Sequence, residues 1–339
     1  MDERHIPISE DTILMAKLAR KDQGDHETEV SFNGEADLQS AFIMCEKNPS
    51  HTNYMPVFDM TLETLPDVVK KQSVVDFLIS KSMETVRIVC NRTSEARPAG
   101  YTFYNYRGKR MFRYGSGRIW SVYVDKIKTD IPCPFEDCTV IDGPHFVHGY
   151  LRVHTAMHVV FDDIEAQATT IDFFYDKPDD RSTVITARGV KVVKSDVDGD
   201  YCVMDCVTHD VQLCQKLDSI RKTWAHLWPE VKDFLYGKDI SFVVSHPHGR
   251  EKQMSIGKCC ERNWGKGSGD QGWYKYAFTA ATCPGSSGAP VWVPGRDGLF
   301  SGYAPHSGYD KKTGLNISCV WYFWKENSSS EDIISDEKK

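Results

Sequence analysis

The stretch ATCPGSSGAPVWV at residues 281–293 places a serine between glycines, immediately ahead of an apolar run. The flanking TCP and VWV segments predict a tight turn that enters a β-strand. A serine hydroxyl is a poor nucleophile, so it needs a base to accept its proton and nearby amides to bind the resulting oxyanion. Glycines at positions 285 and 288 let the backbone curl so that successive N–H groups converge on one point. Ser287 is therefore the candidate nucleophile, and the alternative is an ordinary Gly-Ser loop.

The candidate base lies upstream, in the stretch TAMH at residues 155–158, just after the largely apolar GYLRV. A histidine at the end of a strand can accept the serine proton near neutral pH, because its free pKa is close to 6.5. His158 is the candidate, and His154, four residues earlier, is the alternative.

A serine–histidine pair also needs a buried carboxylate, which fixes the imidazole tautomer and stabilises the imidazolium. Asp200 fits best, because it follows the turn DVDG and opens the apolar run YCVM, which would hold it at the mouth of a strand. The alternatives are Asp162, Asp163, Asp198 and Asp205.

Short β-branched and aromatic runs alternate with Gly, Asp and Pro turns from about Glu84 onward, which favours an all-β barrel or sandwich over a parallel α/β sheet. The runs are TVRIVC, YTFYNY, RIWSVYV, TVITARGVKVV, YCVMDCV, DISFVVS and ISCVWYF. Apolar residues at three- and four-residue spacing predict a helix at Val211–Leu235, inserted between strands. A similar pattern predicts an amphipathic helix within Leu65–Ser82, after Pro66.

The order histidine, aspartate, serine along the chain is the order used by chymotrypsin. With the motifs YGSGRIW, TAMH, DYCVM and GSSGAP, the chain resembles the trypsin-like (chymotrypsin-fold, PA clan) serine peptidases, and more closely their intracellular and HtrA-like branches. A fifth segment, VVSHPHGREKQMSIG at 243–257, is similar to the strand–turn–strand before the serine in HtrA-like enzymes, although His246 stands where the glycine would be. The resemblance covers about residues 84–324.

This resemblance implies two perpendicular six-stranded antiparallel barrels, with His158 and Asp200 from the first and Ser287 from the second. The N–H groups of Gly285 and Ser287 would form the oxyanion hole. The implied activity is that of a serine endopeptidase, which hydrolyses polypeptides through an acyl-enzyme and requires no metal or cofactor.

The resemblance also implies a pocket for the substrate side chain. Its floor would be Ala281, six residues before the serine, beside Thr282, and its wall would come from Tyr303, His306 and Ser307. An alanine floor offers no carboxylate for Lys or Arg, so we expect an apolar or polar-uncharged preference.

Three regions are expected. Residues 1–83 would form a partly disordered N-terminal extension that ends in an amphipathic helix, residues 84–324 the peptidase domain, and residues 325–339 a disordered acidic tail. Insertions around residues 121–148 and 211–235 would pad the surface rather than cover the cleft.

The composition limits the partners. A net charge of -7 argues against non-specific binding of nucleic acid or of an anionic membrane. The chain has no run of 18 apolar residues, and its start, MDERHIPISED, lacks a secretory pattern, so we expect a soluble intracellular protein with its 11 cysteines as thiols. Cys133 and Cys138 with His145 and His148 are spaced poorly for zinc.

One stretch keeps a second class of function open. Residues 101–118, YTFYNYRGKRMFRYGSGR, hold five basic residues and six aromatics, which could grip single-stranded nucleic acid. The favoured interpretation is a hairpin that turns at Arg107–Gly108. The alternative function is therefore a catalytically silent binding or regulatory module on the same fold.

Overall fold

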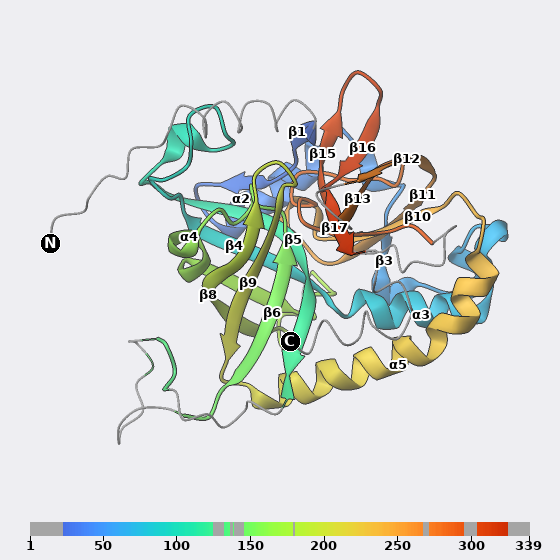
Figure 1. The fold of residues 1–339 in the computed structure, drawn as a ribbon, viewed down its shortest axis with the longest axis horizontal. Helices are drawn as coiled ribbons and strands as arrows, with labels where there is room; N and C mark the ends of the chain where they lie inside the picture. Colours follow the sequence, from blue (N-terminus) through green and yellow to red (C-terminus); the bar gives the residue numbers. More distant parts are fainter. Residues whose placement is uncertain are drawn as a thin grey trace, which may run out of the picture.

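The computed structural model describes residues 23–124, 132–135, 138, 146–178, 180–266, 271–294 and 304–324. In this part of the chain the strands form two antiparallel sheets that lie side by side (Figure 1). The predicted all-β, double-barrel fold class is confirmed by the strand pairings described below.

The first sheet has the strand order β2-β5-β4-β7-β8-β9-β6, and β6 also pairs with β5. This extra pairing closes β4 to β9 into a six-stranded barrel, with β2 added outside the circuit along β5. The strands are β2 (Glu29–Ser31), β4 (Thr85–Arg92), β5 (Arg110–Tyr123), β6 (Gly149–Thr155), β7 (Thr169–Phe173), β8 (Ile185–Asp196) and β9 (Tyr201–Thr208).

The second sheet has the order β12-β13-β16-β15-β14-β10-β11-β3, with β1 on β15 and β17 on β13. Only Lys258 separates β11 from β12, so these two act as one bent strand that completes a six-membered circuit. The strands are β1 (Asp25–His26), β3 (Met55–Pro56), β10 (Ser241–Ser245), β11 (Gln253–Gly257), β12 (Cys259–Lys266), β13 (Gln271–Phe278), β14 (Pro290–Trp292), β15 (Ala304–Asp310), β16 (Leu315–Ser318) and β17 (Trp321–Trp324).

The α-helices lie outside the two barrels (Figure 1). They are α2 (Glu35–Ile43), α3 (Gln72–Ser82), α4 (Asp163–Gln167) and α5 (Val211–Leu235), and the short 3-10 helices are η1 (Pro49–His51), η2 (Val57–Asp59), η3 (Leu62–Thr64), η4 (Asp67–Val69), η5 (Tyr104–Tyr106) and η7 (Pro247–Gly249).

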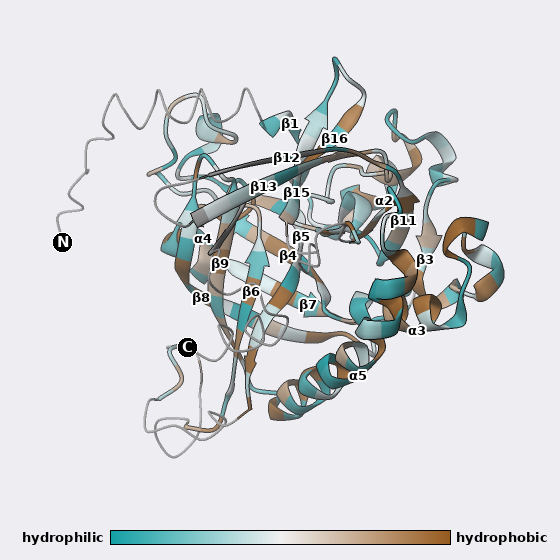
Figure 2. Ribbon diagram, turned by 45° about the vertical axis from the view of Figure 1, so that its right-hand side comes forward, coloured by the Kyte–Doolittle hydropathy of each residue, from teal (hydrophilic) through white to brown (hydrophobic). Residues whose placement is uncertain are grey.

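Helix α5 has the bounds that its periodicity predicts. The Asp210 side chain caps it by accepting hydrogen bonds from the Gln212 and Leu213 amides. Its buried apolar stripe packs on α3, where Phe77 meets Trp224 edge to face at 6.5 Å between centroids. Both helices carry hydrophobic as well as hydrophilic residues in Figure 2, and α5 contacts β5 and β6 on the outside of the first barrel.

Helix α3 begins later than expected. The Leu65–Ser82 segment first makes the 3-10 turn η4 after Pro66, and Lys71 is extended (φ -151°, ψ 138°), so the α-helix starts at Gln72. Lys70 (φ -73°, ψ 92°) is extended as well, so these two residues separate the 3-10 turn η4 from the α-helix.

Residues 23–83 are not a separate extension, which corrects the boundary expected at residue 83. Strands β1 and β3 join the second sheet and β2 joins the first. Their polar sequence has little periodicity, because edge strands are held by backbone hydrogen bonds to a partner rather than by a buried face of their own. The expected acidic tail, at residues 325–339, lies outside the described residues.

The basic aromatic stretch is not a hairpin either. Residues 104–106 form η5, and the only strand within 101–118 is the start of β5. Arg113 and Arg118 are buried, so two of its five basic side chains do not face solvent. Most of the expected insertion at 121–148 is outside the described residues. No helix in the described part of the chain is long and apolar enough to cross a bilayer.

Candidate active site

The three candidate catalytic residues come from the two sheets. His158 follows β6, and Asp200 precedes β9 in the β8–β9 turn, so both belong to the first barrel. Ser287 lies in the turn before β14 of the second sheet. The fold thus brings His158 to Asp200, which is 42 positions away in the chain, and to Ser287, which is 129 positions away.

The three side chains form a continuous hydrogen-bonded chain. His158 Nδ1 lies 2.8 Å from Asp200 Oδ2 and 3.0 Å from Oδ1, and His158 Nε2 lies 2.6 Å from Ser287 Oγ. All three residues are fully buried. In this arrangement the Ser287 hydroxyl donates to Nε2, and Asp200 accepts the proton on Nδ1.

The Asp200 carboxylate is held on several sides. Its backbone is left-handed (φ 54°), a conformation that Asp tolerates better than most residues. Ser307 Oγ donates to Oδ2 at 2.5 Å, and the His158 amide donates to Oδ1 at 3.1 Å. Burial alone would raise the pKa of this carboxyl, but the charges of His158 and His26, together with these hydrogen bonds, hold the pKa below its ordinary value. Asp200 is therefore ionised.

The backbone of His158 is fixed from behind by a buried ion cluster. Arg97 Nη2 donates to the His158 carbonyl at 3.0 Å and to Glu165 Oε2 at 2.7 Å. Arg113 joins the same Glu165 carboxylate at 2.8 Å, and all of these side chains are buried. The motif histidine is thus anchored to the barrel core rather than to a free loop.

The turn at Ser287 depends on Gly285, which has φ 95°. A Cβ there would lie 2.5 Å from the His246 carbonyl oxygen, so only glycine fits. The Gly-Ser-Gly strand at 115–117 supports the same turn from the first barrel: Ser116 Oγ donates to the Gly285 carbonyl at 2.8 Å, and the Ser116 amide donates to the Ser287 carbonyl at 2.7 Å.

The two predicted oxyanion-hole amides converge on one atom. The N–H groups of Gly285 and Ser287 both donate to the backbone carbonyl oxygen of Glu27, at 2.7 and 3.2 Å. The Glu27 amide in turn donates to Ser287 Oγ at 3.0 Å. A carbonyl group of the N-terminal segment therefore lies directly beside the candidate nucleophile.

The Glu27 side chain is surrounded by polar side chains close to the serine. Its Oε2 accepts hydrogen bonds from Thr282 Oγ1 at 2.5 Å and His306 Nε2 at 2.7 Å, and its Oε1 pairs with Lys47. Asn316 Oδ1 accepts from Lys47 Nζ and lies 2.8 Å from Thr282 Oγ1. The side chains around the Glu27 carboxylate are therefore hydrogen-bond donors and one cation, whereas the alanine at position 281 led us to expect apolar or uncharged surroundings.

Glu27 and His306 shift the pKa of each other. Burial raises the pKa of Glu27, but the His306 hydrogen bond and the Lys47 charge outweigh it and lower the pKa to about 2. For His306, burial lowers the pKa more than Glu27 raises it. The pair is therefore a carboxylate that accepts a hydrogen bond from a neutral imidazole, with Lys47 supplying the positive charge.

The expected pocket residues are only partly gathered here. Thr282 and His306 contact the Glu27 carboxylate. Ser307 instead gives its hydroxyl to Asp200, and the Ala281 carbonyl accepts from Ser255 at 2.7 Å. Tyr303 lies outside the described residues.

Sequence reasoning missed Glu27, His26, Lys47 and Asn316. None of them lies in a recognisable motif, and Glu27 is 260 positions from Ser287.

The alternatives to the three residues have other partners. The imidazole of His154 packs edge to face on Trp120, and Asp205 pairs with Arg152 at 2.8 Å. Asp162 caps α4, and Asp163 accepts from the Val192 amide at 2.7 Å.

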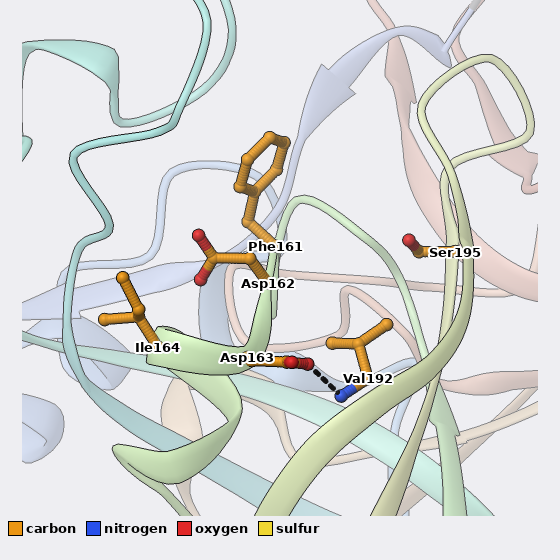
Figure 3. Close-up of a pocket in the computed structure, with 6 residues that line it drawn as sticks. All are labelled: Phe161, Asp162, Asp163, Ile164, Val192 and Ser195. Carbon is orange, nitrogen blue, oxygen red and sulfur yellow. Dashed lines mark hydrogen bonds between the residues drawn. The ribbon is translucent and has the colours of Figure 1, made fainter. Parts of the chain in front are cut away.

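A surface pocket near α4 contains none of the three residues (Figure 3). Figure 3 shows Asp163 turned to the Val192 amide across it. It is lined by Phe161, Asp162, Asp163, Ile164, Val192 and Ser195. This pocket is separate from the site at Ser287.

No family model matches the chain, and no curated protein matches it. Among solved structures, it is similar to the active form of the Rv3671c protease from M. tuberculosis, with 15% identity and a TM-score of 0.38 over 75% of this chain and 82% of that chain. The inactive form of that protease has 14% identity to this chain and a TM-score of 0.36, over 80% of this chain and 93% of that chain.

The chain is also similar to the HtrA-type protease AlgW with tripeptide, with 12% identity and a TM-score of 0.38 over 77% of this chain. It spans 63% of the AlgW chain. Similarities of this size transfer no function, so a functional conclusion depends on the geometry of the site.

Proposed function

We propose that this chain is a serine endopeptidase in which Ser287 is the nucleophile, His158 the general base and Asp200 the orienting carboxylate. One observation carries the proposal: His158 bridges Asp200 and Ser287 at hydrogen-bond distance, while two amides converge on a carbonyl oxygen beside Ser287. Nucleophile, base and oxyanion donors are thus all within reach of one peptide group.

The mechanism follows from these contacts. Ser287 Oγ attacks the substrate carbonyl carbon while His158 Nε2 takes the hydroxyl proton. The N–H groups of Gly285 and Ser287 stabilise the oxyanion, and the ionised Asp200 stabilises the imidazolium. His158 then protonates the leaving amine, which leaves an acyl group on Ser287. Water, deprotonated by His158, hydrolyses that ester and regenerates the serine.

A catalytically silent module would need a blocked cleft or misaligned groups. The Glu27 backbone does occupy the site beside Ser287, but as a peptide group in reach of the nucleophile, and the three groups are aligned. The short His158–Ser287 contact and the buried, ionised Asp200 argue against this alternative. The burial of Arg113 and Arg118 also weakens a nucleic-acid role for residues 101–118. A polypeptide is therefore the proposed substrate.

A fluorophosphonate probe tests the proposal, because it forms a stable bond with an activated serine. We expect labelling at Ser287 once the Glu27 segment has left the site, and we expect Ser287→Ala and His158→Ala to lower kcat by up to about a millionfold, since triad members act as one unit. Ser182→Ala, at an exposed serine, is the matched control. Folded protein that is neither labelled nor able to hydrolyse any member of a mixed peptide library would refute the proposal.

A further inference from the structure

The segment at residues 25–31 crosses the site as an extended strand that pairs with both sheets. On one side of Glu27, β1 pairs with β15 in the register Asp25↔Tyr309 and His26↔Gly308. On the other side, β2 pairs with β5, beginning at Glu29↔Tyr114. The two pairings hold the Glu27–Thr28 peptide bond between the barrels, directly at Ser287.

The partner strand β15 has a glycine that allows the segment at residues 25–31 to approach it closely. A Cβ at Gly308 would lie 2.6 Å from the carbonyl oxygens of both Gln23 and Asp25, so glycine makes room for the incoming backbone. The imidazole of His26 stacks on the imidazole of His158 and so covers the candidate base. Backbone pairing, the oxyanion contacts and the polar contacts of the Glu27 side chain together fix one peptide group against the nucleophile.

From these contacts we propose that the peptidase cleaves its own chain, in cis, between Glu27 and Thr28, and that it prefers glutamate before the cleaved bond. The proposal rests on the proposed function. It assigns the substrate class of the same site: extended segments with a glutamate whose carboxylate reaches Thr282, His306 and Lys47.

The reaction balances without a cofactor. Ser287 Oγ bonds to the Glu27 carbonyl carbon, and its proton passes to His158. The Glu27–Thr28 C–N bond breaks, and His158 returns the proton to the Thr28 amine. Water then releases Glu27 as a free carboxylate and restores Ser287. The products are a fragment that ends at Glu27 and a protein that begins at Thr28.

The test follows freshly made full chain by intact mass and N-terminal sequencing. We expect a new N-terminus at Thr28, formed at a rate constant that stays the same over a hundredfold dilution. Ser287→Ala should remain whole. Glu27→Gln and Glu27→Ala should slow cleavage at least about tenfold to a hundredfold, whereas Glu63→Gln, at an exposed glutamate outside the site, should cleave as the parent does.

Peptides separate failure of this inference from failure of the proposed function. The peptides GDHETEV, GDHQTEV and GDHATEV are offered to the protein, together with the mixed library and the fluorophosphonate. Labelled protein that cleaves library peptides after residues other than glutamate, or that leaves its own 27–28 bond intact, overturns the inference alone. A rate that rises with protein concentration overturns the cis assignment. Absence of labelling and of all hydrolysis overturns the proposed function.

A second and independent observation concerns four side chains next to the nucleophile turn: Cys45, His51, His248 and Cys283. Their ligand atoms all lie within 4.8 Å of one another. Cys45 Sγ is 3.5 Å from Cys283 Sγ, and Cys283 Sγ is 3.7 Å from His51 Nε2. A tetrahedral zinc ion, with bonds of about 2.0 to 2.3 Å, holds its ligand atoms about 3.3 to 3.8 Å apart.

The surroundings of these side chains also suit a metal. The backbone amide of Asn48 lies 3.4 Å from Cys45 Sγ, and its side-chain nitrogen lies 3.1 Å from Cys283 Sγ. Both groups are placed as N–H donors to thiolates are. His248 Nδ1 contacts Glu29 Oε2 at 2.7 Å, the carboxylate contact typical of a zinc-bound imidazole. Its Nε2 is buried and has no hydrogen-bond partner among the described residues.

The geometry points to a structural zinc site with a Cys2His2 ligand set. Two sulfurs and two imidazoles select zinc over Mg²⁺ or Ca²⁺, and four protein ligands close the coordination shell. The ion would fasten η1 and the end of α2 to η7 and to Cys283, two residues before Gly285 of the oxyanion hole. Lys47 and Asn48 lie between the ligands Cys45 and His51 along the chain, so the ion would also hold these two residues beside Thr282.

Metal analysis of purified, reduced Ser287→Ala protein tests the site. We expect Cys45→Ser and His51→Gln each to lower the zinc content by one equivalent per chain, and Cys260→Ser, at an exposed cysteine, to leave it unchanged. Cys133, Cys138 and His209 form another group of possible ligands. Cys133→Ser is therefore a second control, and we expect it to keep the zinc bound at Cys45.

Cobalt substitution gives a readout that does not depend on activity. Co²⁺ added to metal-free protein should produce a thiolate charge-transfer band that weakens in Cys45→Ser. Since Cys45 is only half buried, this variant is the one expected to fold. Zinc content that is the same in Cys45→Ser and the parent, or a Cys45–Cys283 disulfide found by mass under non-reducing purification, overturns the assignment.

Discussion

The imidazole of His26 lies flat against the imidazole of His158, with ring centroids 3.8 Å apart and planes inclined by 12°. His26 Nδ1 contacts Thr102 Oγ1 at 2.6 Å, and its Nε2 is 3.8 Å from Asp200 Oδ2. The residue before Glu27 thus shields the candidate base from solvent and is itself held in place.

His26→Ala should slow cleavage at the 27–28 bond about tenfold, because an aromatic stack and its buried area contribute roughly 1 to 2 kcal/mol. The rate of appearance of the Thr28 N-terminus measures this. Asp25→Asn is the control, since Asp25 is exposed and pairs with Lys311 at the surface. Equal rates for the His26 variant and the parent would mean that the stack does not contribute to the reaction.

Ser307→Ala should lower kcat about tenfold to a hundredfold with little change in KM. Its hydroxyl is a donor to the buried Asp200 carboxylate, and a hydrogen bond to a charged group contributes about 1.5 to 3 kcal/mol. Ser307→Thr keeps the hydroxyl and should restore part of the rate. Steady-state kinetics on GDHETEV gives both constants, and a change confined to KM would instead place Ser307 in the pocket.

Glu27 should make the stability of the Ser287→Ala protein depend on pH. Its pKa is about 2 in the folded chain, below the ordinary 4.5, so the folded state favours the carboxylate. This contribution, about 3 kcal/mol at neutral pH, is fully present above pH 4.5 and is lost as the pH falls toward 2. Urea unfolding of Ser287→Ala with and without Glu27→Gln should show a difference at pH 7 that shrinks by pH 3. A constant difference would contradict this.

Glu165→Gln should destabilise the Ser287→Ala protein by about 3 to 5 kcal/mol, because it leaves the buried Arg97 and Arg113 without their shared carboxylate. Urea midpoints measure the loss. The matched control is Glu230→Gln, whose partner Lys71 lies at the surface, and its midpoint should equal that of the parent. A Glu165 variant as stable as this control would show that the cluster does not hold the barrel together.

Local sequence patterns were enough to predict the turns and the helix that depend only on neighbouring residues. The glycines of GSSGAP predict the turn at Ser287 because left-handed backbone is a property of the residue itself. The three- and four-residue spacing in Val211–Leu235 predicts α5 with its bounds, and DVDG followed by YCVM predicts a turn before β9. The same patterns failed at Leu65–Ser82, where the extended Lys70 and Lys71 separate the 3-10 turn η4 from α3.

What only the tertiary structure decided is which distant residues meet. Glu27 reaches Ser287 because two sheet edges, formed by other strands, accept β1 and β2, and an edge strand carries no periodic signal of its own. Cys45 and Cys283 are 238 positions apart, so no spacing in the sequence could pair them. The chain thus specifies its turns and helices locally, whereas the occupant of the cleft depends on contacts that exist only once both barrels have closed.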